Sequence, residues 1–285
     1  MPHDMRGCED GAYSTNSIAD LGAGAGARRL FLGVPIDCLT LRDTVVAAGR
    51  AIESGRSAKG GRALQHVCLN VAKFVAMRAN PELDSDVRSS DIISVDGMGI
   101  VWGARLLGVD VPERVTGVDV MEGVIGLCAE RGYRPYFLGA RPEVLERAVA
   151  KTTSRHPGLV FAGWRDGYYR PDEEDSVVAE IDAAGADCLF IGMPTPRKER
   201  FLARRRAALR VPFIMGVGGG LDVLAGEVRR APASVQNLGL EWLFRAVQEP
   251  LRLGPRYAKT NLAFAAILAS ALWESRRPRT RRPLG

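Results

Sequence analysis

Cysteine and histidine are scarce in this sequence, and neither occurs at a metal-binding spacing. The five cysteines lie far apart and form no C-x-x-C pair: Cys8, Cys38, Cys68, Cys128 and Cys188. An odd, scattered set indicates reduced thiols in a cytosolic protein rather than a disulfide framework. The three histidines also lack the spacing of zinc ligands. We therefore expect no metal site built from these residues and no cofactor.

The common nucleotide-binding signatures are missing as well. The glycine-rich run at 22–27 follows no expected strand, and no Gly-Lys-Ser/Thr triplet completes a Walker loop. The one D-x-D motif, Asp84-Ser85-Asp86, lies in a polar stretch between a helix and a strand, where we expect a solvated turn. The sequence thus offers neither a Walker-type phosphate site nor an acidic pair placed to hold a divalent cation.

The composition is that of a globular protein with a sizeable core. The chain has 285 residues, of which 46% are hydrophobic and 25% charged. Residues 1–28 are rich in Gly, Ala and Ser and hold no apolar run, so we expect a disordered extension rather than a secretory signal. We predict an α/β core over 29–235 and a helical appendage over 236–285 that ends in a basic tail.

Positive charge is concentrated at the C-terminal end. Residues 250–285 contain eight Lys or Arg and one acid, Glu274, which gives a net charge of +7 against +6 for the whole chain. A nucleic-acid-binding protein more often spreads its basic residues over the body of its fold. We therefore expect no nucleic-acid partner, and we expect an anionic partner to meet the C-terminus.

Short apolar runs alternate with longer helical patterns along the chain. The expected strands cover 64–72, 91–97, 134–140, 158–164, 187–193 and 211–219. Several are apolar at consecutive positions, as strands covered on both faces are. Helical patterns occupy 40–55, 141–156 and 195–210, the first with Thr40 as its N-cap and Asp43 three residues later. The alternation predicts a Rossmann-like α/β fold with a mainly parallel sheet flanked by helices.

A single carboxylate, Asp96, lies between an expected strand and an expected helix in SVDGMGIVWGARLLG, residues 94–108. Ligands of open α/β sheets bind outside the carboxyl ends of the strands. Gly97 and Gly99 permit close approach of a ligand to the backbone beside it. Asp96 is therefore a candidate for chemistry. The alternative is that it caps the following helix, because Asp is a favoured N-cap residue.

Three further strand ends carry elements that suit a phosphate group. Gly139 follows one expected strand, Gly192 precedes the run PTPRKER, and the run GVGGG at 216–220 is followed by Asp222. Glycine-rich loops after strands present backbone N–H groups to anions. Together with the carboxylate at a fourth strand end, these loops predict a phosphorylated ligand.

Five motifs occur in one order: SVDGMGIVWGARLLG, RVTGVDVMEGV, YFLGARPEVLERA, LFIGMPTPRKERFL and GVGGGLDVLAGEVRRAPASVQNLGLEWLFRAVQEPLRL. Together they resemble the WecG/TagA/CpsF glycosyltransferases (glycosyltransferase family 26), over about residues 64–256. The resemblance implies inverting, metal-independent transfer of a sugar, of N-acetylmannosamine or glucose type, from a UDP-sugar. It implies a polyprenyl-diphosphate-linked sugar as acceptor and a role in cell-surface polysaccharide synthesis.

The resemblance also implies roles for individual residues, with Asp96 as the catalytic base. The acceptor side comprises Asn70, Cys68, Arg245, Arg252 and Arg256. The UDP-sugar side comprises Gly139, Gly192, Lys198, Glu199, Gly218, Gly219 and Asp222. Cys68 stands where many members have threonine, and Lys198 where they usually have glutamine. Lys198 either contacts the diphosphate or is solvated at the start of a helix; solvation at the surface is also the alternative for the arginines.

Residues 261–273 form a strongly apolar segment. One helix face is made by Phe264, Ile267, Leu268, Ala271 and Leu272. Thirteen helical residues span about 20 Å, short of a hydrocarbon core of about 30 Å. With Trp273 and the basic tail that follows, the segment predicts peripheral attachment to an anionic membrane, on its cytoplasmic face. The alternatives are packing on the core and an interface of a homo-oligomer.

Two other function classes stay open. A nicotinamide-dependent oxidoreductase would need a G-x-G-x-x-G turn after the first strand and an acid about 20 residues later, and the sequence has neither. A non-catalytic, membrane-associated scaffold of polysaccharide assembly would have no use for Asp96, Asn70 and the glycine loop. The sequence therefore favours an enzyme.

Overall fold

The computed structural model describes residues 28–57 and 62–276. Residues 1–27 of the expected extension and the basic tail after Arg276 lie outside the described residues. Arg28, which was also expected in the disordered extension, instead begins a strand.

The core of the fold is a six-stranded parallel sheet, as the alternating pattern predicts. The strands are β3 (Leu64–Leu69), β4 (Ile92–Val95), β5 (Pro135–Gly139), β6 (Gly163–Arg165), β7 (Cys188–Gly192) and β8 (Phe213–Gly216). Their order in the sheet is β4-β3-β8-β7-β5-β6, and all pairs are parallel. The residues of β4 and β8 are all buried, which explains their largely apolar sequences.

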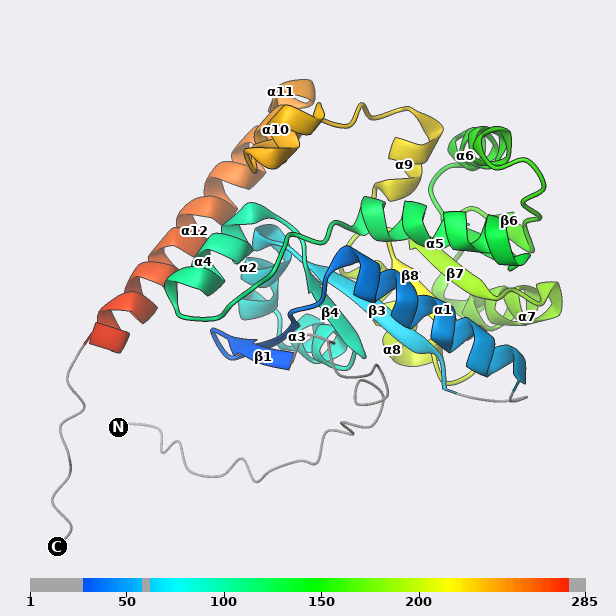
Figure 1. Ribbon diagram of the computed structural model, residues 1–285, viewed down its shortest axis with the longest axis horizontal. Coiled ribbons are helices and arrows are strands. Elements are labelled where there is room, and N and C mark those ends of the chain that lie inside the picture. The colour runs from blue at the N-terminus through cyan, green and yellow to red at the C-terminus, as the bar shows by residue number, and fades with distance from the viewer. Residues whose placement is uncertain (1–27, 58–61, 277–285) are drawn as a thin grey trace, which may run out of the picture.

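Helices cover both faces of this sheet (Figure 1). One layer consists of α1 (Leu41–Ser57), α5 (Gly117–Arg131), α6 (Pro142–Arg155) and α9 (Gly220–Ala225). The other contains α2 (Val71–Ala79), α3 (Pro81–Arg88), α7 (Glu174–Ala184), which follows the short turn Pro171–Glu173, and α8 (Arg197–Arg205). The predicted start of α1 is confirmed, because the Thr40 hydroxyl accepts the Asp43 N–H at 3.1 Å and the Asp43 carboxylate accepts the Thr40 N–H at 3.2 Å.

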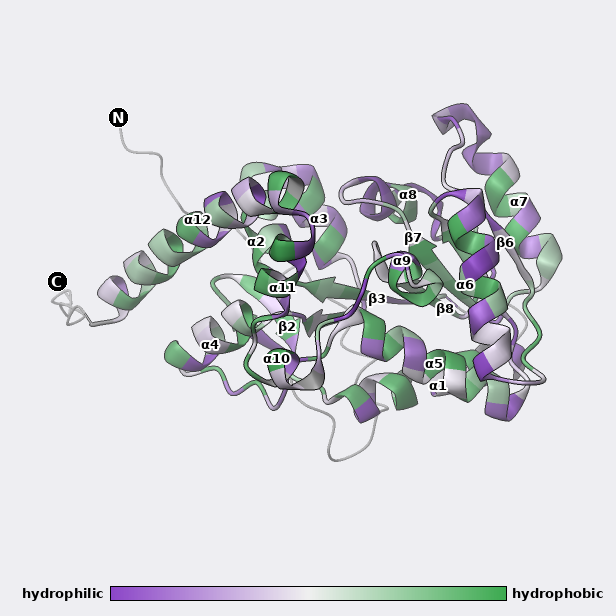
Figure 2. Cartoon of the chain, turned by 90° about the horizontal axis from the view of Figure 1, so that it is seen from above, coloured by the Kyte–Doolittle hydropathy of each residue, from purple (hydrophilic) through white to green (hydrophobic). Residues whose placement is uncertain are grey.

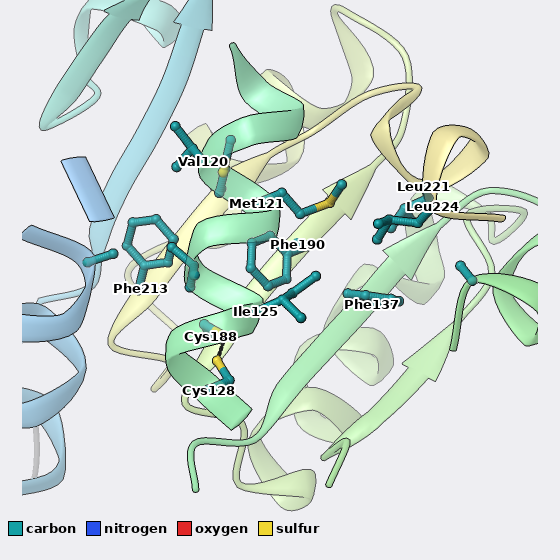
Figure 3. Packing of buried hydrophobic residues seen from close by; sticks show 14 of the residues in the cluster. Val120, Met121, Ile125, Cys128, Phe137, Cys188, Phe190, Phe213, Leu221 and Leu224 are labelled. Atoms are coloured by element: carbon teal, nitrogen blue, oxygen red, sulfur yellow. Dashed lines mark hydrogen bonds between the residues drawn. The ribbon is translucent and has the colours of Figure 1, made fainter. Parts of the chain in front are cut away.

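Aromatic rings of neighbouring strands fill the core beneath α5. Phe137 of β5 and Phe190 of β7 meet edge to face, with ring centroids 5.9 Å apart, and both are fully buried. Met121 and Ile125 of α5 lie over these rings (Figure 3). Cys128 and Cys188 pack below them with their sulfur atoms 3.5 Å apart. The four cysteines in the described part of the chain are free thiols, as their spacing indicates.

Two local predictions are wrong. The strand expected over 158–164 shrinks to the edge strand β6, because Leu159 and Phe161 use their apolar side chains to pack on the core instead. Phe161 lies 4.9 Å from Phe137, centroid to centroid. The D-x-D motif is part of α3 rather than a solvated turn. Asp84 pairs with Arg88 at 2.6 Å, and Asp86 is buried 3.4 Å from Arg200.

A hairpin that the sequence did not reveal covers one edge of the fold. It joins β1 (Arg28–Phe31) to β2 (Val34–Asp37) through a two-residue turn in which Leu32 and Gly33 have positive φ. Arg28 donates two 2.9 Å hydrogen bonds to Asp37 across the pair. Phe31 points into the cluster formed by α2, α4 (Met98–Leu106) and β4.

The C-terminal region is helical, as expected, but its apolar face contacts protein. It contains α10 (Ala233–Asn237), α11 (Glu241–Gln248) and α12 (Pro250–Arg276), and α12 runs alongside α2 (Figure 1). Phe264 is 6% exposed and meets Phe74 edge to face at 5.7 Å. Ile267 and Leu268 join the same cluster. Truncation of a buried Phe typically costs about 3–5 kcal/mol, so this face stabilises the fold.

Because this face of residues 261–273 packs on protein, any contact with a membrane would have to be made by other residues of the C-terminal helices. Within residues 28–57 and 62–276, none of the helices combines the length and hydropathy that crossing a bilayer requires. Apolar residues are visible along α11 and α12 (Figure 2). Those that face solvent are Trp242, Leu243, Val247, Leu251, Leu262 and Trp273.

Candidate active site at the carboxyl edge of the sheet

Two adjacent strands direct the chain to opposite faces and so open a crevice between them. β3 pairs with β8, and it is followed by α2 in one helix layer, while β8 is followed by α9 in the other. Such a switch point is where ligands of open α/β sheets bind. The carboxyl ends of β4, β7 and β5 lie at the same edge. The sequence prediction that four strand ends form one site is consistent with this arrangement.

Asp96 and Asn70 are neighbours at this edge. Leu69 of β3 pairs with Val95 of β4, and the Asp96 N–H donates to the Leu69 carbonyl at 2.8 Å. Asn70 follows directly and caps α2, since its side-chain oxygen accepts the Lys73 N–H at 2.9 Å. The Asn70 side chain thus has its oxygen engaged, and its amide NH₂ is the group that it can offer to a ligand.

Asp96 does not cap the helix that follows it. α4 begins at Met98, its N-cap is Gly97 with φ +106°, and the cap has no side-chain hydrogen bond. A backbone in this region favours glycine, which explains the residue next to Asp96. The capping interpretation is therefore wrong, and the carboxylate is held at the strand end for another reason.

The pKa of Asp96 is raised to about 6, from a usual value of 3.8. Burial is the largest cause, because it disfavours the ionised form, and the negative charge of Glu241 adds to it. Arg114, Arg245 and the Gly117 N–H oppose the rise. The carboxylate is half-buried, so it is partly shielded from water and still reachable.

The α11 helix supplies much of this electrostatic environment. Glu241 forms an ion pair with Arg114 at 2.9 Å, and both side chains are mostly buried. Arg245 lies one turn further along α11 and acts on Asp96. The sequence pointed to Arg245 through the family resemblance, whereas Arg114 and Glu241 lie in two of the same motifs but were not singled out as site residues. Only the tertiary fold brings these two charges beside Asp96.

Cys68 lies below this site rather than in it. Its side chain is 7% exposed and sits 3.5 Å from the Ser94 hydroxyl. A Cβ at Gly117 would approach the sulfur atom at 3.2 Å. Burial first, and then the charge of Asp96, raise the pKa of the thiol to about 12. Cys68 is therefore a neutral packing residue beneath the helix that begins at Gly117.

Two of the glycines expected to bind UDP-sugar are explained by packing. A Cβ at Gly139 would lie 2.6 Å from the Gly192 backbone, so β5 and β7 approach too closely for a side chain there. A Cβ at Gly192 would lie 2.4 Å from Leu221. Both positions thus need glycine whether or not a ligand is present.

The glycine-rich turn after β8 is open to solvent at Gly219, but it offers few unused amides. Gly219 is exposed, and a Cβ at Gly218 would meet nothing within 4 Å. However, the N–H groups of Val217 and Gly218 donate to the Ile191 carbonyl, and the Gly220 N–H donates to Val217. Asp222 is half-buried in α9 near Gly219. A bound diphosphate at this edge would therefore depend on cationic side chains more than on this loop.

Lys198 and Glu199 are both buried at the start of α8, so solvation of Lys198 at the helix start is ruled out. They form a cluster with Lys73, which sequence analysis did not single out. Arg256 of α12 is exposed and lines a cavity of about 200 Å³ together with Asn70, Lys73 and Thr195. The side chain of Arg252 lies outside the described part.

A half-buried carboxylate of raised pKa beside buried cations, at the switch point of a parallel sheet, is typical of an enzyme that acts on an anionic substrate. In the described part of the chain, no cluster of three or more His, Cys, Asp or Glu side chains is arranged to hold a metal ion. Residues 29–278 match the sequence model of the Glycosyl transferase WecG/TagA/CpsF family. The chain belongs to this family and is a glycosyltransferase. This assignment favours catalysis over the scaffold and oxidoreductase alternatives.

We expect the Asp96 carboxyl to titrate near pH 6, with charges on α11 moving its pKa in opposite directions. Glu241→Gln removes a negative charge and lowers the pKa, whereas Arg245→Gln removes a positive charge and raises it. Carboxyl ¹³C NMR titration measures both, with Asp96→Asn to identify the signal. Glu143→Gln, on the exposed face of α6, is the matched control and leaves the pKa unchanged. A pKa near 3.8 in the unmodified chain would refute this description of the site.

Proposed function

We propose that this glycosyltransferase moves a sugar from a UDP-sugar to a polyprenyl-diphosphate-linked sugar, with inversion and without a metal ion. The sugar is of N-acetylmannosamine or glucose type, a hexosyl or N-acetylhexosaminyl group, and the product enters cell-surface polysaccharide synthesis. The observation that carries the proposal is the position and pKa of Asp96, one carboxylate at the strand edge beside Asn70.

A single base suffices for an inverting transfer. The acceptor hydroxyl oxygen forms a bond to the anomeric carbon while the bond from that carbon to the UDP oxygen breaks. The hydroxyl proton passes to Asp96, and UDP leaves with the electron pair of the broken bond. A general base of this kind usually contributes about 10²–10⁴-fold to the rate. With a pKa of about 6, Asp96 is mostly ionised at neutral pH and more basic than a solvated carboxylate.

The leaving diphosphate needs positive charge nearby. Arg114 and Arg245 both act on Asp96 and lower its pKa, so their charges lie near the site of transfer. Charge-assisted hydrogen bonds from such side chains stabilise phosphate oxygens. We propose that these cations take the part that a metal ion plays in other nucleotide-sugar enzymes. The glycine loop and Asp222 would then contact the nucleotide.

The test is a transfer assay with Asp96→Asn, using a panel of UDP-sugars and a short-chain lipid-diphosphate sugar. Asparagine keeps the size of the side chain and cannot accept the proton, so transfer should fall by about 10²–10⁴-fold. UDP binding should stay within about twofold, because the variant removes the base and not the nucleotide contacts. Asp110→Asn, an exposed aspartate, is the matched control and should retain full activity.

Addition of EDTA should leave the rate of the unmodified enzyme unchanged. A wild-type transfer rate in the Asp96→Asn variant would contradict the role of Asp96 as the catalytic base. Loss of activity in EDTA that Mg²⁺ or Mn²⁺ restores would overturn metal independence. Failure of every UDP-sugar, with no UDP binding, would overturn the donor class.

We further propose that the enzyme attaches peripherally to the cytoplasmic face of an anionic membrane through α11 and α12. Support comes from the exposed apolar residues of these helices, of which Val247 is 72% and Leu251 94% exposed. Basic residues of the C-terminal region would add attraction to anionic lipids of about 1 kcal/mol each near the surface. Charges of α11 act on Asp96 and Arg256 of α12 lines the cavity beside Asn70, so attachment would hold the site near a lipid-linked acceptor.

Val247→Glu with Leu251→Glu should reduce sedimentation with anionic vesicles by about tenfold, because two carboxylates replace apolar contacts. Both side chains are exposed, so the fold should survive. Val160→Glu with Tyr168→Glu changes two exposed residues (61% and 72%) far from the C-terminal helices and is the control. Equal sedimentation of the two double variants would contradict attachment through α11 and α12, and would leave a homo-oligomer as the use of this surface.

A further inference from the structure

Two buried lysines share one buried carboxylate next to the candidate active site. Glu199 Oε1 lies 2.9 Å from Lys73 Nζ and 3.0 Å from Lys198 Nζ, and it also accepts the Thr195 hydroxyl at 3.0 Å. The exposed fractions of the two lysines and the glutamate are 8%, 6% and 3%. No other carboxylate of residues 28–57 and 62–276 forms an ion pair with either lysine. The cluster therefore carries one positive charge in excess.

The electrostatics of the cluster reflect this excess. Burial first, and then the charge of Lys73, lower the pKa of Lys198 to about 8. Burial alone would raise the pKa of Glu199, but the two ammonium groups outweigh it and lower that pKa to about 2. Glu199 Oε2 is buried without a hydrogen-bond partner among the described residues. A buried, uncompensated charge is costly for a protein and is usually paired when the site is filled.

The cluster opens onto a cavity in which a negative charge would be neutralised. Lys73 and Thr195 belong to the cluster and also line the cavity of about 200 Å³. Arg256 of α12 also lines it, and Asn70, which directly follows β3, joins it to the strand edge. No acidic side chain is part of this lining. Two cations, a hydroxyl and the amide side chains of Asn70 and Asn80 around a space of this size suit one anionic group with its attached sugar ring.

Lys198 is the residue that unbalances the cluster in this chain. With a neutral residue such as glutamine at this position, Lys73 and Glu199 would form a neutral pair. Lysine at 198 adds a charge that nothing else in the cluster compensates. Its side chain also packs on Gly216, at the end of β8, where a Cβ would lie 3.0 Å from it. The extra charge thus lies inside the crevice and not on the surface.

We propose that this cavity binds an oxyanion group of a substrate, paired with Lys73 and Arg256 and supported by Lys198. The inference rests on the proposed function for its choice of ligands. Two sources supply such a group: the carboxylate of an acidic sugar, and the diphosphate of the lipid-linked acceptor. Either way, Lys73 and Lys198 select an anionic substrate that a neutral pair would not.

Calorimetric titration of the full chain tests this without requiring transfer activity. Inorganic diphosphate and glucuronate are titrated separately, with saturating UDP present so that any donor site is filled. Lys73→Gln and Lys198→Gln each remove the excess charge, and we expect at least a tenfold rise in Kd. Lys151→Gln removes an exposed lysine of α6 and should leave Kd within twofold. Glucuronate binding identifies an acidic sugar, and binding of diphosphate alone identifies the acceptor phosphates.

Glu199→Gln provides a test of opposite sign. It raises the excess charge, so the favoured anion should bind at least threefold more tightly, which a merely misfolded variant would not do. Binding of neither anion by the unmodified chain would overturn the proposal, as would equal Kd values in all five proteins. UDP binding and transfer are measured in parallel. If the anion binds equally well without either lysine while transfer is intact, this inference alone is wrong. If the unmodified chain does not bind UDP, the proposed function is wrong.

Discussion

All six strands of the main sheet run parallel, so every strand ends at the same edge, and the rest of the site follows from that constraint. Asp96 lies beside Asn70 because Val95 pairs with Leu69, one residue earlier on each strand. A slip of one residue in this pair would turn Asp96 to the opposite face of the sheet. The burial of β4 and β3 on both faces fixes the register against such a slip.

The C-terminal helices complete the site that the sheet begins. Phe264 anchors α12 between Phe31 and Phe74, and this contact carries α11 toward the strand edge. Glu241 and Arg245 of α11 then set the pKa of Asp96 in opposite directions. Arg256 reaches the cavity beside Lys73 from the same region. The helix whose sequence resembles a membrane anchor therefore also contributes to the wall of the candidate site.

The parts of the fold that could be predicted from sequence depend on local patterns. The strands and the Thr40–Asp43 cap could be predicted because each has a local sequence pattern. Burial on both faces produces consecutive apolar residues, and capping places polar residues at a fixed spacing. Residues 158–162 were wrongly predicted as a strand, because a loop that packs on the core can have the same apolar sequence pattern as a strand. The D-x-D motif was wrongly predicted to be a solvated turn, because the ion pair that allows Asp86 to be buried is with Arg200, which is distant in the sequence.

The residues of the candidate site also differ in whether the sequence could reveal them. Asp96 and Asn70 could be found as polar residues at strand ends, and Lys198 and Glu199 through the family resemblance. Arg114 and Glu241 lie within the family motifs but, like Lys73, were not recognised as site residues, because their importance lies in contacts between segments distant in sequence. Gly139 and Gly192 show the converse, since their lack of a side chain is explained by strand and helix packing.

The claim that one carboxylate acts as base in a direct displacement is tested most directly by the stereochemistry of transfer. The anomeric proton of the transferred sugar, observed by NMR in the product, reports its configuration. From an α-linked UDP-sugar of the glucose type, our account predicts a β-linked product. An α-linked product would contradict it, because retention requires the bond to UDP to be replaced on the same face.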